Sequence, residues 1–249
     1  MRKLSKTHPA PPILRSNDCV QAQVTLDNEV NLNKRKLSFD KHIYGDSTVK
    51  AQLKSDQHEK CAYCERRKSG DFGDIDHYRP KAEYTVNNIK SKPGYYWLAY
   101  DWENLIFSCT ECNRTYKKSN FPLLDENKRD IINKNINTEY PLIINPYVDN
   151  PVEHICFARH IIKPVMKDGV EDSKGRYTID LFKLNDRRDL LTARREIWNQ
   201  FITYKQTIQI LETFKDLPGA EAALKENMDR FNEMISDQAP HVGMLLNQE

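Results

Sequence analysis

The chain has 249 residues, of which 39% are hydrophobic and 30% are charged, and its formal net charge is +2. This length allows one large domain or two small ones with a buried core, and the lack of a long apolar run or apolar leader predicts a cytoplasmic protein without a membrane helix. The near-neutral charge excludes a generic polycation, so any nucleic-acid site must come from local basic patches.

The N-terminal part, residues 1–57, combines a basic start with a polar region. Prolines between residues 9 and 12 disfavour a helix, so we expect residues 1–28 to form an extended arm. The arm could follow a phosphate backbone, contact a partner or remain a solvated tail. Residues 31–57 have scattered apolar positions and predict one or two helices interrupted near Gly45. The basic residues of the arm are Arg2, Lys3, Lys6 and Arg15.

The central part, residues 58–122, contains two Cys-x-x-Cys pairs. Four thiolates at this spacing suit one tetrahedral zinc ion, and in the cytosol paired cysteines hold metal more often than they form disulfides. We therefore predict a structural zinc that closes the loop between the pairs. Cys19 and Cys156 stand alone in unlike contexts and are interpreted as incidental. The predicted zinc ligands are Cys61, Cys64, Cys109 and Cys112.

Local elements are expected inside this central part. Residues 75–78 suit a short strand, and Cys112 should stand at the start of a short helix. Residues 95–102 are dense in aromatic side chains. We interpret this run as core packing rather than as a surface for stacking bases, because a stacking face would interleave aromatic residues with cations.

The C-terminal part, residues 123–249, is loop-rich up to about residue 176 and helical beyond it. A strand is expected within residues 155–162. Pro218 and Gly219 end one long helix, and residues 221–235 predict another. We interpret the apolar stripe of the first helix as core rather than as a partner interface. The stripe consists of Ile197, Phe201, Tyr204, Ile208 and Leu211.

The segment between the cysteine pairs carries an Asp-His dipeptide that suits phosphodiester hydrolysis. This reaction needs a base that deprotonates water and a cation that stabilises charge on the phosphoryl and leaving oxygens. His77 titrates near neutrality and suits the base. Asp76 precedes it, and neighbours on a strand point to opposite faces, so one can address the water while the other addresses a metal.

Further polar residues complete this candidate site. The amide oxygen of Asn113 is a hard ligand suited to magnesium, and a hydrogen bond from Asn104 could fix the His77 ring. Asn113 and Lys117 are four residues apart and therefore share one face of the expected helix. The candidate phosphate contacts are Arg79, Lys81 and Lys117, with solvated surface as the alternative for each.

These motifs, taken in order, resemble the HNH endonucleases of the ββα-metal type, in the variant braced by a four-cysteine zinc. Within this group, the motif sequences most resemble the PtuB-like HNH proteins of Septu and retron-associated antiphage systems. The specific motifs lie within residues 58–122. They are Cys61-Ala-Tyr-Cys64-Glu65, Asp76-His77-Tyr78-Arg79-Pro80-Lys81, and Asn113-x-x-x-Lys117 through Phe121-Pro122.

The resemblance implies an α+β fold, with a zinc-braced ββα-metal finger embedded in a mainly helical chain. It implies His77 as general base, Asn104 as the residue that orients it, and Asp76 and Asn113 as ligands of a catalytic magnesium or other divalent ion. Whether Asp74 or Asp76 touches that ion stays open. It further implies a nucleic-acid substrate, with DNA favoured over RNA, and an ABC/SMC-like ATPase partner, PtuA.

A second hypothesis is a non-catalytic zinc module that binds nucleic acid or a partner protein. The basic start of the chain and the long amphipathic helix motivate it. The Asp-His dipeptide discriminates between the two hypotheses, because a binding module has no use for an acid beside a base.

Overall fold

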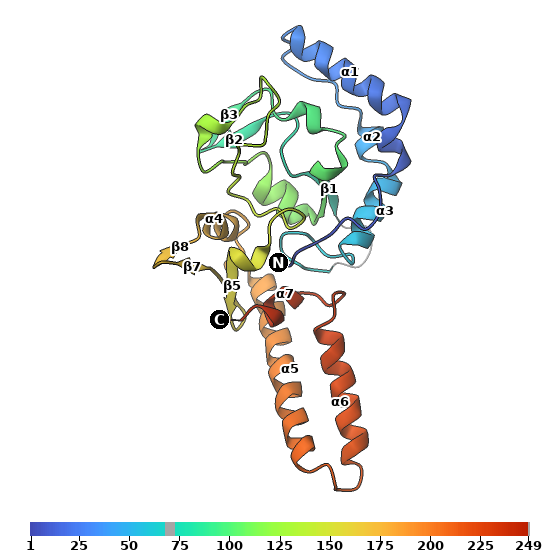
Figure 1. Cartoon of the computed structure of the whole chain (residues 1–249), viewed down its shortest axis with the longest axis vertical. Coiled ribbons are helices and arrows are strands. Elements are labelled where there is room, and N and C mark those ends of the chain that lie inside the picture. Colours follow the sequence, from blue (N-terminus) through green and yellow to red (C-terminus); the bar gives the residue numbers. More distant parts are fainter. Residues whose placement is uncertain (68–72, 249) are drawn as a thin grey trace.

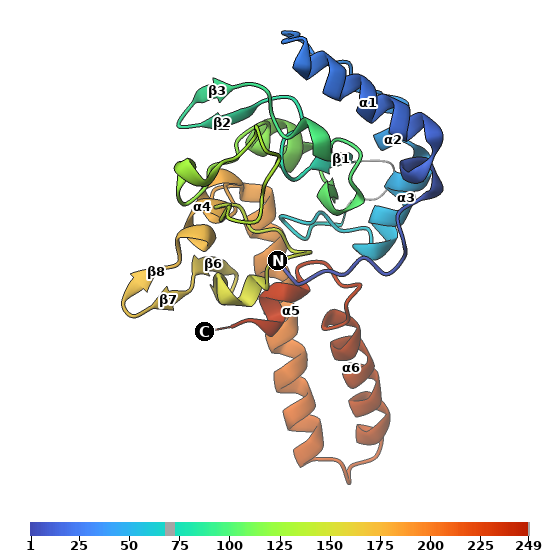
Figure 2. The same cartoon turned by 45° about the horizontal axis from the view of Figure 1, so that its top comes forward.

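The structure is a computed structural model that describes residues 1–67 and 73–248. A body of short helices and small sheets carries a helical hairpin, α5 (Arg188–Thr213) and α6 (Ala220–Met234), which projects away from it (Figures 1 and 2). Within the described ranges, no helix is both long and apolar enough to span a membrane. The fold is α+β, as predicted. The segment 68–72 of the predicted central part lies outside the described residues.

The start of the chain is neither a free tail nor extended throughout. A short 3-10 helix, η1 (Pro12–Arg15), precedes α1 (Asn17–Asn31), so the predicted extended arm is wrong from residue 12 onward. Helix α1 begins after Ser16, whose side chain accepts a hydrogen bond from the Cys19 amide. A serine at this position satisfies one of the unpaired amides of the first turn. The residues before the helix are docked on the body, because Leu4 N donates to Pro146 O at 2.8 Å and Lys3 Nζ donates to Val148 O at 2.6 Å.

Two short helices follow along the same edge of the body. Helices α2 (Lys41–Tyr44) and α3 (Ser47–Asp56) are separated at Gly45, as predicted. Asp40 caps the first and Asp46 caps the second, each by accepting a backbone N–H two residues later. These caps explain why the chain restarts a helix directly after the glycine.

The central part is a small antiparallel pair followed by a helical segment. Strand β1 (Asp74–His77) pairs with β4 (Leu105–Ser108), with His77 opposite Leu105 and Asp76 opposite Ile106. The π-helical segment η4 (Glu111–Lys117) follows directly, and Cys112 lies in its first turn, as predicted. A second hairpin, β2 (Tyr84–Val86) with β3 (Ile89–Ser91), lies within the connection from β1 to β4. The predicted strand is confirmed with bounds shifted by one residue.

The aromatic run at residues 95–102 is core, as predicted. Tyr95, Tyr96, Tyr100 and Trp102 are all buried, and the first of them belongs to the core around the cysteine cluster. The other three pack with the side chains of α1 to α3 in a second core cluster. The run therefore joins the N-terminal helices to the cysteine-bracketed unit.

The C-terminal part begins with two small hairpins. The single strand expected at residues 155–162 is instead a hairpin of β5 (Ile155–Ala158) and β6 (Ile161–Pro164), because the chain turns at Arg159, whose φ is 58°. Strands β7 (Met166–Lys167) and β8 (Val170–Glu171) form the next hairpin. Helix α4 (Ser173–Leu181) then leads to α5, and α7 (Val242–Leu246) returns the chain to the body.

The projecting hairpin holds the apolar stripe predicted for the long helix. Phe201 stacks on Phe231 of α6 with ring centroids 5.1 Å apart. The members of the stripe are only half-buried, because over most of their length the two helices cover each other and not a third layer.

Candidate functional site

The four predicted zinc ligands form one buried cluster. Their sulfur atoms all lie within 4.8 Å of one another, and the Sγ atoms of Cys64 and Cys109 are 3.9 Å apart. Zinc–sulfur bonds of ~2.3 Å in a tetrahedron place the sulfurs ~3.8 Å apart. The donor set, spacing and burial therefore fit a metal ion such as zinc, and the cluster joins the loop before β1 to the end of β4.

An arginine from the C-terminal part completes the surroundings of this cluster. Arg187 is buried and donates to Cys112 Sγ at 3.3 Å, and it also pairs with Glu111. The Cys112 amide donates to Cys109 Sγ at 3.4 Å. A guanidinium beside thiolates offsets the excess negative charge of a four-cysteine zinc site. The sequence gives no local signal for this residue, which stands far from the cysteine pairs along the chain.

His77 is held with one ring nitrogen fixed and the other facing a lysine. Its Nε2 donates to the Ala99 carbonyl at 2.8 Å, and its Nδ1 lies 3.4 Å from Lys81 Nζ. Tyr44 contacts the ring edge-on, with centroids 4.8 Å apart. Burial, and then the Lys81 charge, hold the pKa of His77 well below its usual range. The ring is therefore neutral at pH 7, with its proton on Nε2 and its lone pair on Nδ1.

The sequence predicted a hydrogen bond from Asn104 to the His77 ring. In the structure, Asn104 instead binds backbone groups of the two segments that hold this ring. Its Oδ1 accepts from Arg79 N at 2.8 Å, and its Nδ2 donates to the carbonyls of Arg79 and Leu98 at 3.1 and 3.0 Å. Leu98 precedes Ala99, whose carbonyl holds the ring. The side chain thus ties the chain after β1 to the turn that supplies the ring's partner.

Asp76 points away from His77 into a buried network. Its Oδ2 accepts from Tyr63 at 2.7 Å and its Oδ1 accepts from Lys117 Nζ at 3.0 Å. Lys117 also donates to the His77 carbonyl at 2.8 Å and is fully buried. The alternation of side chains along β1 explains the opposite directions of these two neighbours.

Asn113 lies against Asp74 rather than Asp76. Its Nδ2 donates to Asp74 Oδ2 at 3.2 Å, and Arg114 forms a two-pronged ion pair with the same carboxylate. The magnesium site predicted from Asp76 and Asn113 does not fit these contacts. Both oxygens of the Asp76 carboxylate already accept hydrogen bonds, and the amide is paired with a different acid.

Two of the three predicted phosphate contacts are engaged inside the protein. Arg79 is buried, pairs with Glu139 and stands 5.2 Å from the Tyr95 ring centroid. Lys117 is committed to Asp76 and the backbone, as described above. These contacts argue against a phosphate role for Arg79 and Lys117, because a buried, paired cation cannot reach an external anion without breaking its pair.

Lys81 is the predicted phosphate contact that lacks a carboxylate partner among the described residues. Its Nζ stands 4.4 Å from the Tyr44 ring centroid and 5.4 Å from that of Phe39. Burial lowers the pKa of Lys81 to about 8. Its direct contacts are ring faces and the His77 lone pair, which are weaker partners than a phosphate oxygen, and the Asp76 carboxylate acts on its charge without touching it.

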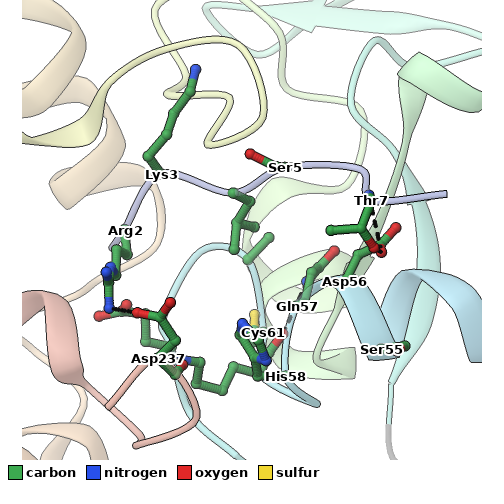
Figure 3. A pocket seen from close by; sticks show the side chains of 14 residues that line it. Arg2, Lys3, Ser5, Thr7, Ser55, Asp56, Gln57, His58, Cys61 and Asp237 are labelled. Carbon is green, nitrogen blue, oxygen red and sulfur yellow. Dashed lines mark hydrogen bonds and ion pairs between the residues drawn. The ribbon is translucent and has the colours of Figure 1, made fainter. Parts of the chain in front are cut away.

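A separate cavity of about 490 Å³ lies beside Cys61, where the docked N-terminal segment crosses the loop after α3 (Figure 3). Among its lining side chains, Arg2 forms an ion pair with Asp237, and the Thr7 hydroxyl donates to Asp56. Among the described residues, the predicted catalytic and phosphate-binding groups do not line it. The cavity is therefore distinct from the region around His77.

Comparison with known proteins gives a consistent result. No protein-family model matches the chain. Septu protein PtuB of Bacillus mycoides (strain KBAB4) is 36% identical over 183 residues, which cover 72% of this chain and 60% of that relative. This chain is similar to Septu protein PtuB. A second PtuB, from Bacillus thuringiensis, is 26% identical over 220 residues, which cover 87% of this chain and 72% of the relative.

The similarity extends beyond PtuB. Septu protein PtuA of Bacillus mycoides (strain KBAB4) is 30% identical over 149 residues, which cover 57% of this chain but 20% of that protein. A PtuA therefore contains a segment related to this chain within a much longer protein. The relationship to the Septu system rests on both names, and neither name states a chemical activity.

Proposed function

We propose that this chain is an HNH-type endonuclease that hydrolyses nucleic-acid phosphodiester bonds and serves as the nuclease subunit of a Septu antiphage defence system. The similarity to PtuB supports the defence role. The observation that carries the chemistry is the arrangement of His77, whose Nε2 is fixed by Ala99 so that the lone pair of Nδ1 faces Lys81. A neutral imidazole in this tautomer is ready to accept a proton.

The reaction follows from these two side chains. Lys81 leaves His77 Nδ1 for a phosphoryl oxygen of the substrate, which is a stronger partner for its ammonium group. The freed Nδ1 takes a proton from a water molecule as the oxygen of that water attacks phosphorus. The phosphorus–oxygen bond to the departing sugar breaks, and that oxygen is protonated from solvent. Lys81 stabilises the charge that builds on the phosphoryl group.

The two metals have different roles in this proposal. Zinc at the four cysteines is structural, since all four positions of its tetrahedron are filled by protein sulfur. A magnesium ion at Asp76 and Asn113 would require Asp76 to release Lys117 and Asn113 to leave Asp74. No step above is assigned to it.

The test is loss of nicking in His77→Ala. Removing a general base costs about 10²–10⁴-fold in rate. His42→Ala, which changes an exposed histidine, is the matched control. Supercoiled plasmid, single-stranded DNA and tRNA are incubated with each protein in magnesium and in EDTA, with and without the PtuA-like ATPase that we propose as its partner. Equal cutting by His77→Ala and the parent would falsify the base assignment.

The non-catalytic zinc module remains the second candidate, and one observation favours it. Tyr63 and Lys117 each engage one oxygen of the Asp76 carboxylate, so in this conformation that acid serves a buried structural network. This candidate expects nucleic-acid binding without cleavage in any divalent ion. Degradation of plasmid or RNA by the parent protein, abolished in His77→Ala, would exclude it.

A further inference from the structure

A cationic groove lies beside the candidate site, between the α1–α2 loop and the start of the aromatic run. It has a volume of about 460 Å³. Its rim carries Lys34, Arg35, Lys36 and Lys92, and its lining includes no carboxylate among the described residues. Leu37, Phe39 and Pro93 supply an apolar floor. We call this feature the 34–36 groove.

The cations of the 34–36 groove differ in how far they are neutralised. Lys34 pairs with the buried Glu29 at 3.2 Å, and Lys92 approaches Glu83 at 3.6 Å. Arg35 and Lys36 are exposed and form no ion pair with any described residue. The rim therefore keeps a local positive charge, although the whole chain is almost neutral.

Two lining residues of the groove, Phe39 and Ala82, lie next to Lys81. Phe39 of the floor lies 5.4 Å from Lys81 Nζ, measured to the ring centroid, and Ala82 of the lining is the next residue in the chain. Lys81 Nζ in turn lies 3.4 Å from His77 Nδ1. Lys81 thus stands between the apolar side of the groove and the ring that would deprotonate water.

We propose that the 34–36 groove binds the sugar-phosphate backbone of the nucleic-acid strand that is presented to His77. This inference rests on the proposed nuclease function and names its substrate track. Unpaired cations on one rim attract a polyanion, and arginine and lysine neutralise successive phosphates. The half-buried apolar side chains of Leu37, Phe39 and Pro93 give sugars or bases a nonpolar contact beside these cations.

The experiment measures binding separately from cleavage. The variant Arg35→Ala/Lys36→Ala/Lys92→Ala removes three rim cations, and Lys205→Ala/Lys215→Ala/Lys225→Ala removes three exposed lysines from the projecting hairpin as a charge-matched control. Both triple variants are made in the parent and in His77→Ala. Fluorescence anisotropy with a labelled single-stranded DNA, and with the matching RNA, gives affinity as a function of salt.

The groove variant should bind on the order of tenfold more weakly, and its log–log salt slope should fall by about 2, since each neutralised phosphate of a single strand contributes ~0.7. The control should bind as the parent does. Unchanged affinity and slope in the groove variant, or equal losses in both triple variants, would overturn the groove. So would a parent chain that binds neither probe.

The two proposals fail separately. Weak binding by the groove variant, together with full cutting by His77→Ala, keeps the groove and removes the assigned base. Normal binding by the groove variant, together with no cutting by His77→Ala, removes the groove and keeps the base.

Discussion

The neighbouring side chains of Asp76 and His77 on β1 point in opposite directions. His77 faces Lys81, which has no carboxylate partner in the part of the chain that the structure describes, whereas Asp76 faces Lys117, which is fully buried. The first contact is exchangeable, because Lys81 directly touches ring faces and a lone pair rather than a carboxylate. The second is a buried ion pair braced by Tyr63, and its loss leaves a charge without compensation.

Lys117→Met should therefore destabilise the protein by about 3–5 kcal/mol, since it strands the buried Asp76 carboxylate. Denaturant unfolding followed by circular dichroism gives this value. Lys118→Met, at the exposed neighbouring position, should change stability by less than about 0.5 kcal/mol. A Lys117→Met protein as stable as the parent would show that the network contributes nothing to folding.

At the scale of elements, the cysteine cluster joins segments that have little regular structure of their own. The β1–β4 pair has four residues in each strand and η4 is seven residues long. Isolated elements of this size are marginal in water. Metal binding at the four cysteines would then supply much of the folding free energy of the unit.

Cys109→Ser should accordingly reduce bound zinc and lower the melting temperature. Atomic absorption and thermal unfolding measure the two effects, and Cys156→Ser, outside the cluster, is the control. Zinc stoichiometry and melting behaviour equal to those of the parent would remove the structural role assigned to the metal.

The sequence predicted the elements whose signals are local. Matched Cys-x-x-Cys spacing located the cluster, and the break at Gly45 separated α2 from α3 correctly. The partners of the site could not be predicted in this way. Ala99 holds the His77 ring through its backbone carbonyl, a group that every residue carries and that therefore gives no sequence signal. Arg187 is distant from Cys112 along the chain and contacts it only because of the tertiary fold.

The sequence also did not predict which charged and polar side chains pair with one another. The resemblance placed Asn113 with Asp76 at one ion and left Asp74 as the alternative acid, and the register of β1 brings Asp74 to Asn113. The sequence predicted Arg79 and Lys117 as phosphate contacts or solvated surface residues. In the structure both are buried, where they form ion pairs with Glu139 and Asp76. Charge alone does not distinguish an anion-binding residue from one half of a buried pair.

At the scale of the whole molecule, the C-terminal segment closes back on the body through His241. Its backbone amide donates to the Glu65 carbonyl, and its side chain is buried among Glu65, Arg66 and Arg194. Burial lowers the pKa of His241 to about 3, an effect that Glu65 opposes and the arginines reinforce. The folded protein therefore holds this imidazole neutral.

Stability should fall as pH drops below the unfolded pKa of ~6.5, because the unfolded chain then binds a proton that the folded chain refuses. The contribution of His241 is fully present above that pH, and about 2 kcal/mol of it is lost by about pH 5. Urea unfolding across this range, compared between the parent and His241→Gln, isolates it. The exposed His42→Gln should track the parent, and a His241→Gln profile as steep as the parent's would contradict the assignment.

Helix α5 is rooted at the cysteine cluster. Its 26 residues span ~39 Å at ~1.5 Å per residue, and Arg187, directly before its first turn, touches Cys112. One end of the helix is thus in contact with the cysteine cluster, and the other end lies at the tip of the projecting hairpin. A partner that binds near Phe214, just beyond the far end of the helix, would therefore be linked to Cys112 through the length of α5 and Arg187.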